Sequence, residues 1–268
     1  MTAASAADVL SAGGTVITAT HRLARQIRQR HDLARAAAGA RAWPMADVLP
    51  LDAWLRRAWE ATALCDAPPG RQRLLSDDES RIVWRRVLAA DGAERLDSGV
   101  ILPLVAAGWS LCQAWGISSG DLAAAADSED ARTFARWVRA YQDELGRRSW
   151  IDSAGLLQAA GRVGDFTGRG ARASRGGPFG FAGFDPWTPA LASLAGTLGA
   201  TGIRVSALAP PRRTGTLGVV AARDESDELA RAFAWAASHS GQAPGSPPAI
   251  IVPDLAEQAA RVRRIGLD

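Results

Sequence analysis

Two threonines and three arginines near the amino end of the chain are the residues best suited to binding an anion. Thr18 and Thr20 end a short β-branched segment, and Arg22, Arg25 and Arg28 follow at steps of three residues. On a helix each such step turns the side chain by about 60°, so the arginines share one broad face. A helix N-terminus binds phosphate through its free N–H groups and partial positive charge. The spacing therefore indicates a phosphate site at a strand-to-helix junction, with a solvated face as the alternative.

The chain contains no lysine, so arginine supplies the fixed positive charge of its side chains. A Walker A loop needs a lysine to reach the β- and γ-phosphates of ATP, and Schiff-base catalysis needs an amine that can lose its proton. Arginine stays protonated and cannot replace that amine. The composition therefore argues against standard P-loop ATP hydrolysis and against Schiff-base chemistry.

A G-x-S-x-G pattern surrounds Ser118, between Gly116 and Gly120. In serine hydrolases this pattern follows a strand, so that the serine hydroxyl stands exposed at the edge of a sheet. Here a long apolar segment with helical character precedes the pattern. This favours Ser118 as a helix cap rather than as a catalytic nucleophile. A small-molecule α/β hydrolase is kept as the alternative function.

The histidines and cysteines show no metal-binding pattern. His21, His31 and His239 lack ligand spacing, and Cys65 and Cys112 belong to no CxxC or Cys/His cluster. We expect no metal, no cofactor and no disulfide framework. No run approaches the ~20 apolar residues of a membrane span, and the N-terminus lacks the layout of a signal peptide. The sequence predicts a reduced, cytoplasmic protein without a membrane partner.

Composition places the chain among ordinary globular proteins, because 47% of its 268 residues are hydrophobic and 22% are charged. The net charge of +3 permits a polyanionic partner without requiring one. Among ten tryptophans, Trp43 and Trp187 fall in predicted loops, where base stacking is the alternative to the favoured core packing.

The sequence pattern predicts strands and helices at both ends of the chain and helices in the middle. β-Branched and apolar runs predict strands at residues 14–20, 179–184, 203–208, 216–222 and 249–252. Apolar stripes at helical spacing predict helices at residues 51–65, 76–88, 98–115 and 128–145. The segment 98–115 is nearly all apolar, so we expect a buried helix there.

Five segments, in this order, match the pattern of a known family. The first two are TVITATHRLARQIRQRH and AWPMADVLPLDAWLRRAW, and the others are FGFAGFDPWTPALASLAGTL, DESDELARAFAWAASH and PPAIIVPDLAEQAARVRR. They resemble the AddB-like, UvrD-related proteins described as probable DNA repair proteins, which end in a PD-(D/E)XK nuclease domain. The resemblance covers nearly the whole chain, although the middle helices match in type more than in sequence.

The resemblance implies an α/β fold with a P-loop-helicase-like parallel sheet. Residues 1–50 and 179–210 would form the first helicase-like domain, and residues 51–165 a large helical subdomain inserted in it. Residues 166–178 would be a Gly/Arg-rich linker. Residues 211–268 would begin a second α/β domain and stop before completing it.

The residues that drive such a helicase are missing from this sequence. No GxxxxGK[ST] loop precedes the first strand, and the acidic pair of a Walker B strand would fall at Ala182 and Gly183. Asp185 lies nearby but out of place. No nuclease motif occurs either. We therefore expect no enzyme activity from this chain.

The resemblance also implies contacts with the backbone of single-stranded DNA at Thr18, Thr20, His21 and Arg22. Together with the arginine face, the candidate DNA-binding residues are Thr18, Thr20, His21, Arg22, Arg25 and Arg28. We expect a non-catalytic, helicase-like DNA-binding module of a repair or recombination helicase–nuclease. It would bind a single strand or a duplex end through phosphates, beside a nuclease domain or a helicase motor subunit. A truncated gene remnant without its own activity is a further alternative.

Overall fold

A computed structural model describes residues 4–63, 72–92, 98–162, 177–209, 217–240 and 248–267. The chain divides into two compact units, Met1–Pro211 and Arg212–Asp268. The Gly/Arg-rich segment predicted as a linker at residues 166–178 lies almost wholly outside the described residues.

A parallel sheet of four strands, in the order β2–β1–β5–β6, is the centre of the first unit. The strands are β1 (Thr15–Thr18), β2 (Val48–Pro50), β5 (Phe179–Ala182) and β6 (Val205–Leu208). Thr15 of β1 lies opposite Phe179 of β5, so segments far apart in the sequence become neighbours. The predicted α/β class with a parallel sheet is confirmed.

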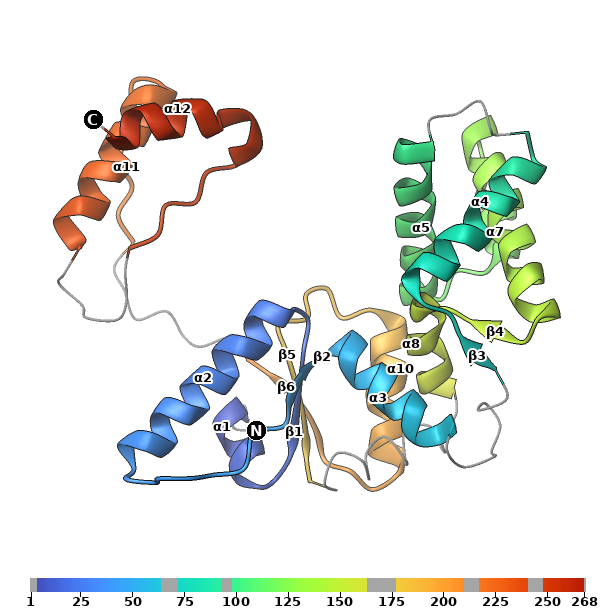
Figure 1. The fold of residues 1–268 in the computed structure, drawn as a ribbon, viewed down its shortest axis with the longest axis horizontal. Coiled ribbons are helices and arrows are strands. Elements are labelled where there is room, and N and C mark those ends of the chain that lie inside the picture. Colours follow the sequence, from blue (N-terminus) through green and yellow to red (C-terminus); the bar gives the residue numbers. More distant parts are fainter. Residues whose placement is uncertain are drawn as a thin grey trace. The chain divides into compact units, whose positions relative to one another are not determined.

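Helices cover both faces of this sheet (Figure 1). One face carries α1 (Ala6–Ser11) and α2 (His21–Ala37), and the other carries α3 (Leu51–Ala63), α8 (Ser153–Arg162) and α10 (Pro189–Ala200). Successive strand residues point to opposite faces. Val16 therefore packs in the core beneath α1 and α2, whereas Ile17 packs in the core beneath α3, α8 and α10.

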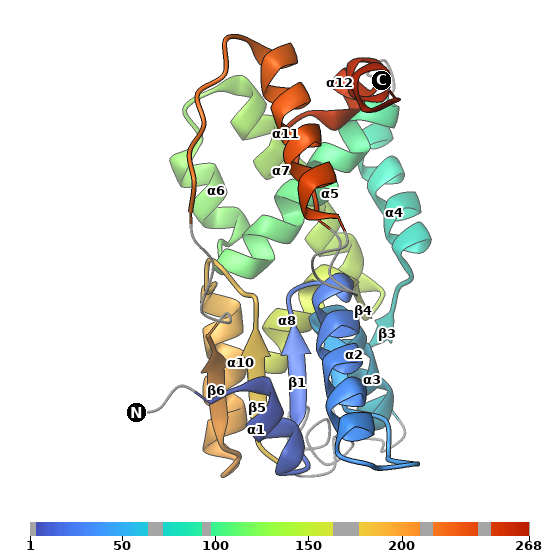
Figure 2. The same cartoon turned by 90° about the vertical axis from the view of Figure 1, so that its left-hand side faces the viewer.

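The other helices of the first unit form a separate helical lobe (Figures 1 and 2). Its elements are α4 (Asp77–Ala90), α5 (Ser98–Trp115), α6 (Ser119–Ala125) and α7 (Glu129–Arg147), with the short paired strands β3 (Arg73–Leu74) and β4 (Trp150–Ile151). The predicted insertion at residues 51–165 is thus larger than the lobe. Its two ends, α3 and α8, share the core of the sheet, where Trp54 and Leu156 are buried.

Aromatic rings and one carboxylate fill the centre of the lobe. Trp84 stacks on Tyr141 with ring centroids 3.8 Å apart, and Trp109 meets Tyr141 edge-on at 5.7 Å. The buried Asp152 carboxylate accepts hydrogen bonds from Trp109 Nε1 at 2.7 Å, the Tyr141 hydroxyl at 3.0 Å and the Gly155 amide at 2.8 Å. Burial raises the pKa of Asp152 above its ordinary value. This carboxylate joins α5 and α7 to the start of α8.

The prediction that residues 98–115 form a buried helix was wrong for one face of α5. Val100, Leu104, Leu111 and Trp115 are between 44% and 63% exposed, although the helix carries no charged residue. Only the opposite face of α5 packs into the lobe, through residues such as Trp109.

The second unit contains two helices, α11 (Glu225–His239) and α12 (Leu255–Leu267). Arg261 of α12 pairs with Glu225 of α11. The strands predicted at residues 216–222 and 249–252 do not form among the described residues. Val219 and Ile251 are about nine-tenths exposed, because no neighbouring strand pairs with these segments.

Candidate functional site

The candidate anion-binding residues lie at the carboxyl edge of the parallel sheet, beside its topological switch point. The strand after β1 in the sequence, β2, lies on one side of β1, and β5 lies on the other side. In open α/β sheets ligands bind outside the carboxyl ends of the strands, at the point where the strand order reverses. Here that point is formed by the loop from β1 to α2 and the loop that follows β5.

A glycine holds these two loops close together. The Ala19 amide donates to the Ala182 carbonyl at 3.0 Å, which extends the pairing of β1 and β5 by one residue. Gly183 follows with φ +76°, and a Cβ atom at this position would lie 2.5 Å from Leu23 Cδ2 of α2. The positive φ favours glycine, and a larger residue would also make the Leu23 side chain move. Gly183 therefore sets how near α2 lies to the loop after β5.

The two candidate threonines shape the junction in different ways. The Thr18 side chain is fully buried, and its hydroxyl donates to the Thr20 carbonyl at 2.9 Å. The predicted contact between Thr18 and a phosphate therefore needs correction, because this side chain is not accessible to a ligand. Thr20 is exposed and caps α2, where its hydroxyl accepts from the Leu23 amide at 3.2 Å. Thr18 positions the junction, and Thr20 lies at its surface.

His21 is the first residue of α2 and has a carboxylate neighbour that sequence reasoning missed. Its Nε2 lies 3.4 Å from Asp52 Oδ2, in the first turn of α3, and both side chains are exposed. β1 and β2 are adjacent parallel strands, so the helices that follow them start side by side. An anion at this edge would meet His21 together with Asp52.

The arginines of α2 lack acidic partners in the part of the chain that the structure describes. Among the described residues, none of the five arginines of α2 forms an ion pair with a carboxylate. The helix has one acidic residue, Asp32, whose carboxylate accepts from Trp43 Nε1 at 2.7 Å. Arg22 and Arg25 are exposed, whereas Arg28 is half-buried with its Nε shielded from solvent. The predicted arginine face is thus an unneutralised positive surface.

The charge at the start of α2 opposes the helix dipole. Its first turn holds His21 and Arg22 and no acidic residue, whereas α4, α7 and α11 each begin with two or three acidic residues. Negative charge at a helix N-terminus is stabilising, and positive charge there is destabilising. An anion bound at this end would remove the conflict.

Aromatic side chains follow β5 on the other side of the switch point. Trp187 meets Phe181 and Phe184 at ring-centroid distances of 5.4 and 6.1 Å, and it is 37% exposed. Packing thus holds most of the ring and leaves part of it at the surface. Trp43 is held by the hydrogen bond from its Nε1 to Asp32 of α2.

The remaining sequence candidates lie elsewhere. Ser118 caps α6 in a capping box with Asp121 and follows a helix rather than a strand, as expected for a cap. His239 stacks near Trp235 within α11 of the second unit. In the part of the chain that the structure describes, no three His, Cys, Asp or Glu side chains are placed to hold a metal ion.

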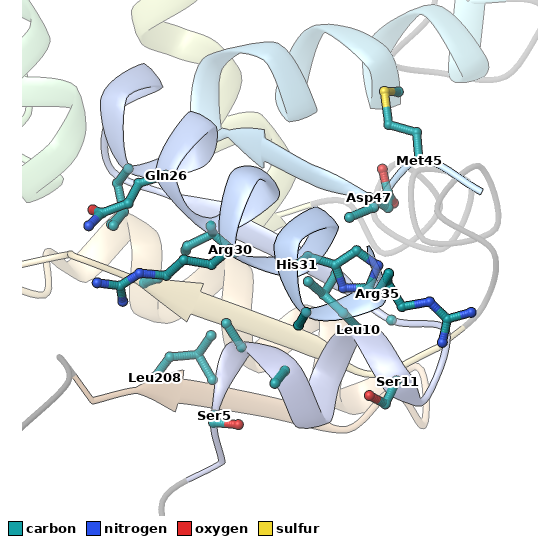
Figure 3. A pocket seen from close by; sticks show the side chains of 18 of the residues that line it. Ser5, Leu10, Ser11, Gln26, Arg30, His31, Arg35, Met45, Asp47 and Leu208 are labelled. Atoms are coloured by element: carbon teal, nitrogen blue, oxygen red, sulfur yellow. The ribbon is translucent and has the colours of Figure 1, made fainter. Parts of the chain in front are cut away.

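Beside the switch point, a groove of about 780 Å³ runs between α1 and α2 (Figure 3). Gln26, Arg30, His31 and Arg35 line it from α2. Sequence reasoning missed Gln26, Arg30 and Arg35 as site residues. The one available signal was their place on the same helix as Arg22.

No known protein family matches the sequence, and no curated protein is significantly similar to it. Among the described residues, no single helix is long and apolar enough to cross a membrane, and α5 with α6 passes that test only as a pair bent by 107°.

Proposed function

We propose that this chain is a non-catalytic, helicase-like DNA-binding module that holds DNA through its phosphates. The observation that carries the proposal is the arginine-rich helix α2, which begins at the ligand-binding edge of the sheet and whose arginines form no ion pair with a carboxylate among the described residues, although His21 lies beside Asp52. Guanidinium groups bind phosphate oxygens in bidentate fashion, and unpaired ones need not first break an ion pair. Exposed Arg22 and Arg25, with the free N-terminus of α2, form the centre of the interface.

The resemblance to AddB-like, UvrD-related proteins supports the same function. It suggests DNA-backbone contacts at Thr20, His21 and Arg22, which lie together at the switch point. Since the sequence lacks Walker A and Walker B residues, the module would work beside a nuclease domain or a helicase motor subunit in the cytoplasm. Thr18 holds the loop in place through the hydrogen bond that its hydroxyl donates to the Thr20 carbonyl.

Binding of a fluorescent single-stranded oligonucleotide, measured by anisotropy over a series of salt concentrations, tests this proposal. Affinity should fall linearly on a log–log plot, since each phosphate contact releases counterions. The double variant Arg22→Ala/Arg25→Ala should bind more weakly, and the magnitude of its salt slope should fall by about 1.4, at about 0.7 per lost contact to a single strand.

A matched control removes two other exposed arginines, Arg85 and Arg86 of α4 in the helical lobe. This double variant loses the same net charge but should keep the affinity and slope of the unchanged protein. Equal losses in both double variants would mean that overall charge, rather than α2, governs binding. An affinity that does not depend on salt would refute the proposal.

A further inference from the structure

The groove between α1 and α2 has an apolar floor, and β5 presents small residues on this face of the sheet. Gly180 and Ala182 alternate with Phe179 and Phe181 along β5, and the two phenylalanines point into the opposite core. Leu208 of β6 leans over Gly180, where an added Cβ atom would lie 2.7 Å from its Cδ1. The remaining floor and walls are also apolar, from Leu10, Leu23, Ile27, Ala34 and Ala182. The groove therefore offers an apolar floor, and its volume is about that of a small-molecule site.

The rim of the groove is positively charged. Arg30 projects from α2 near Gln26, and Arg35 lies farther along the helix beside His31 (Figure 3); neither arginine meets a carboxylate among the described residues. Asp47 also lines the groove, but Arg57 binds both of its oxygens, at 2.7 and 3.1 Å. A ligand that suits these surroundings has an apolar face and negative charge at its margin.

The groove opens toward the candidate DNA site. Leu23 and Gly183 line it, and the same two residues make the close contact between α2 and the loop after β5. Arg22, Gln26 and Arg30 follow one another along α2 at intervals of four residues, which is a rise of about 6 Å per step. Phosphates held by the two arginines of this row would bring the rest of each nucleotide over the groove, which Gln26 lines between them.

We infer that the groove takes up the unpaired bases of the DNA strand whose phosphates α2 holds, an inference that rests on the proposed function. The faces of the bases pack on the apolar floor of the groove and thereby lose their contact with water. The Gln26 amide offers a donor and an acceptor to the edge of a base. In a duplex the bases are paired and stacked inside the helix, so they do not enter the groove. The site consequently selects single strands over duplex DNA, with little dependence on sequence.

The test compares three probes of equal length: an oligothymidine strand, an abasic strand with the same phosphates, and a duplex. The whole chain should bind oligothymidine about tenfold or more tightly than the abasic strand, given the contribution of stacked bases. Two variants test the groove. The double variant Ala7→Leu/Ala34→Leu fills it from both helices, and Gln26→Leu removes the side-chain amide. Both should weaken oligothymidine binding and leave abasic binding unchanged. Ala140→Leu, on an exposed position of α7, is the matched control.

The outcomes separate the two proposals. Equal, salt-dependent affinities for oligothymidine and abasic strands would overturn base uptake while leaving the phosphate-binding function intact. Failure to bind any strand would overturn both. If filling the groove changes the sedimentation of the protein and not its preference for bases, a second copy of the chain occupies the groove, which also overturns the inference. Circular dichroism of each variant establishes that it is folded.

Discussion

At the scale of single residues, the surroundings of each arginine decide its role. Arg147 and Arg148 of the helical lobe share the carboxylate of Glu144, and Arg132 and Arg136 lie beside Glu129. Such exposed pairs contribute little to stability, but they satisfy the guanidinium groups. The arginines of α2 have no such neighbours among the described residues and keep their capacity for an external anion.

The buried carboxylate of Asp152 predicts a pH-dependent stability. Burial raises its pKa, so the folded state holds the proton more tightly than the unfolded chain. Between the ordinary and the raised pKa, its contribution to stability is greatest at the acidic end and falls as pH rises. Asp152→Asn keeps only one acceptor oxygen, so either the Gly155 amide or the Trp109 and Tyr141 donors lose their acceptor, which costs about 1–3 kcal/mol. The loss in free energy of unfolding should therefore be largest near pH 4 and shrink toward pH 7.

Urea unfolding followed by tryptophan fluorescence, at several pH values, measures this effect. Asp143→Asn is the control, because this carboxylate is on the exposed side of α7. A loss that grows as pH rises would show that the folded protein stabilises the ionised carboxylate of Asp152, contrary to the expectation.

At the scale of elements, α2 combines a sound cap with an unfavourable charge pattern. Thr20 supplies the N-cap, yet Arg22 occupies the first turn, where negative charge is preferred. A helix optimised for stability alone would begin as α4 does, with Asp77, Asp78 and Glu79. We interpret the pattern in α2 as stability given up in favour of anion binding.

Charge reversal at the start of α2 tests that interpretation. Arg22→Glu should raise the free energy of unfolding by about 0.5–1 kcal/mol, because a carboxylate then faces the positive end of the helix. The same change should weaken binding of a single-stranded oligonucleotide. Arg25→Glu is the comparison: the dipole effect falls off beyond the first turn, so this variant should lose affinity with a smaller gain in stability. A loss of stability in Arg22→Glu would contradict the interpretation.

At the scale of the whole molecule, the candidate site belongs to one compact unit. All four strands of the sheet, α2 and the groove lie within Met1–Pro211. The second unit supplies no residue to the site as described. A fragment of residues 1–211 should therefore unfold in one cooperative transition and bind the oligonucleotide with the salt slope of the whole chain.

Thermal unfolding followed by circular dichroism and anisotropy titration test this fragment. Residues 212–268, expressed alone, serve as the control and should not bind with the same salt slope. Aggregation of the first fragment, or loss of its binding, would mean that the second unit completes the folded site.

Local sequence was enough to predict the features that depend on neighbours a few residues apart. The helix cap at Ser118 is of this kind, since the serine side chain accepts from a backbone amide three residues away. The strand before α2 and the arginine face of α2 belong here too. Strands of two or three residues, such as β2 to β4, have too little periodicity to be recognised, and none of the three was predicted.

Only the tertiary structure decided which of these features form a site. The sequence alone determined that α2 is rich in arginine, but not that its arginines lack partners or that Thr18 is buried. The strands predicted at residues 216–222 and 249–252 likewise do not form in the part of the chain that the structure describes, because a strand needs a neighbour to satisfy its backbone. Ion pairs, burial and the groove all depend on distances between segments far apart in the chain, and folding alone sets those distances.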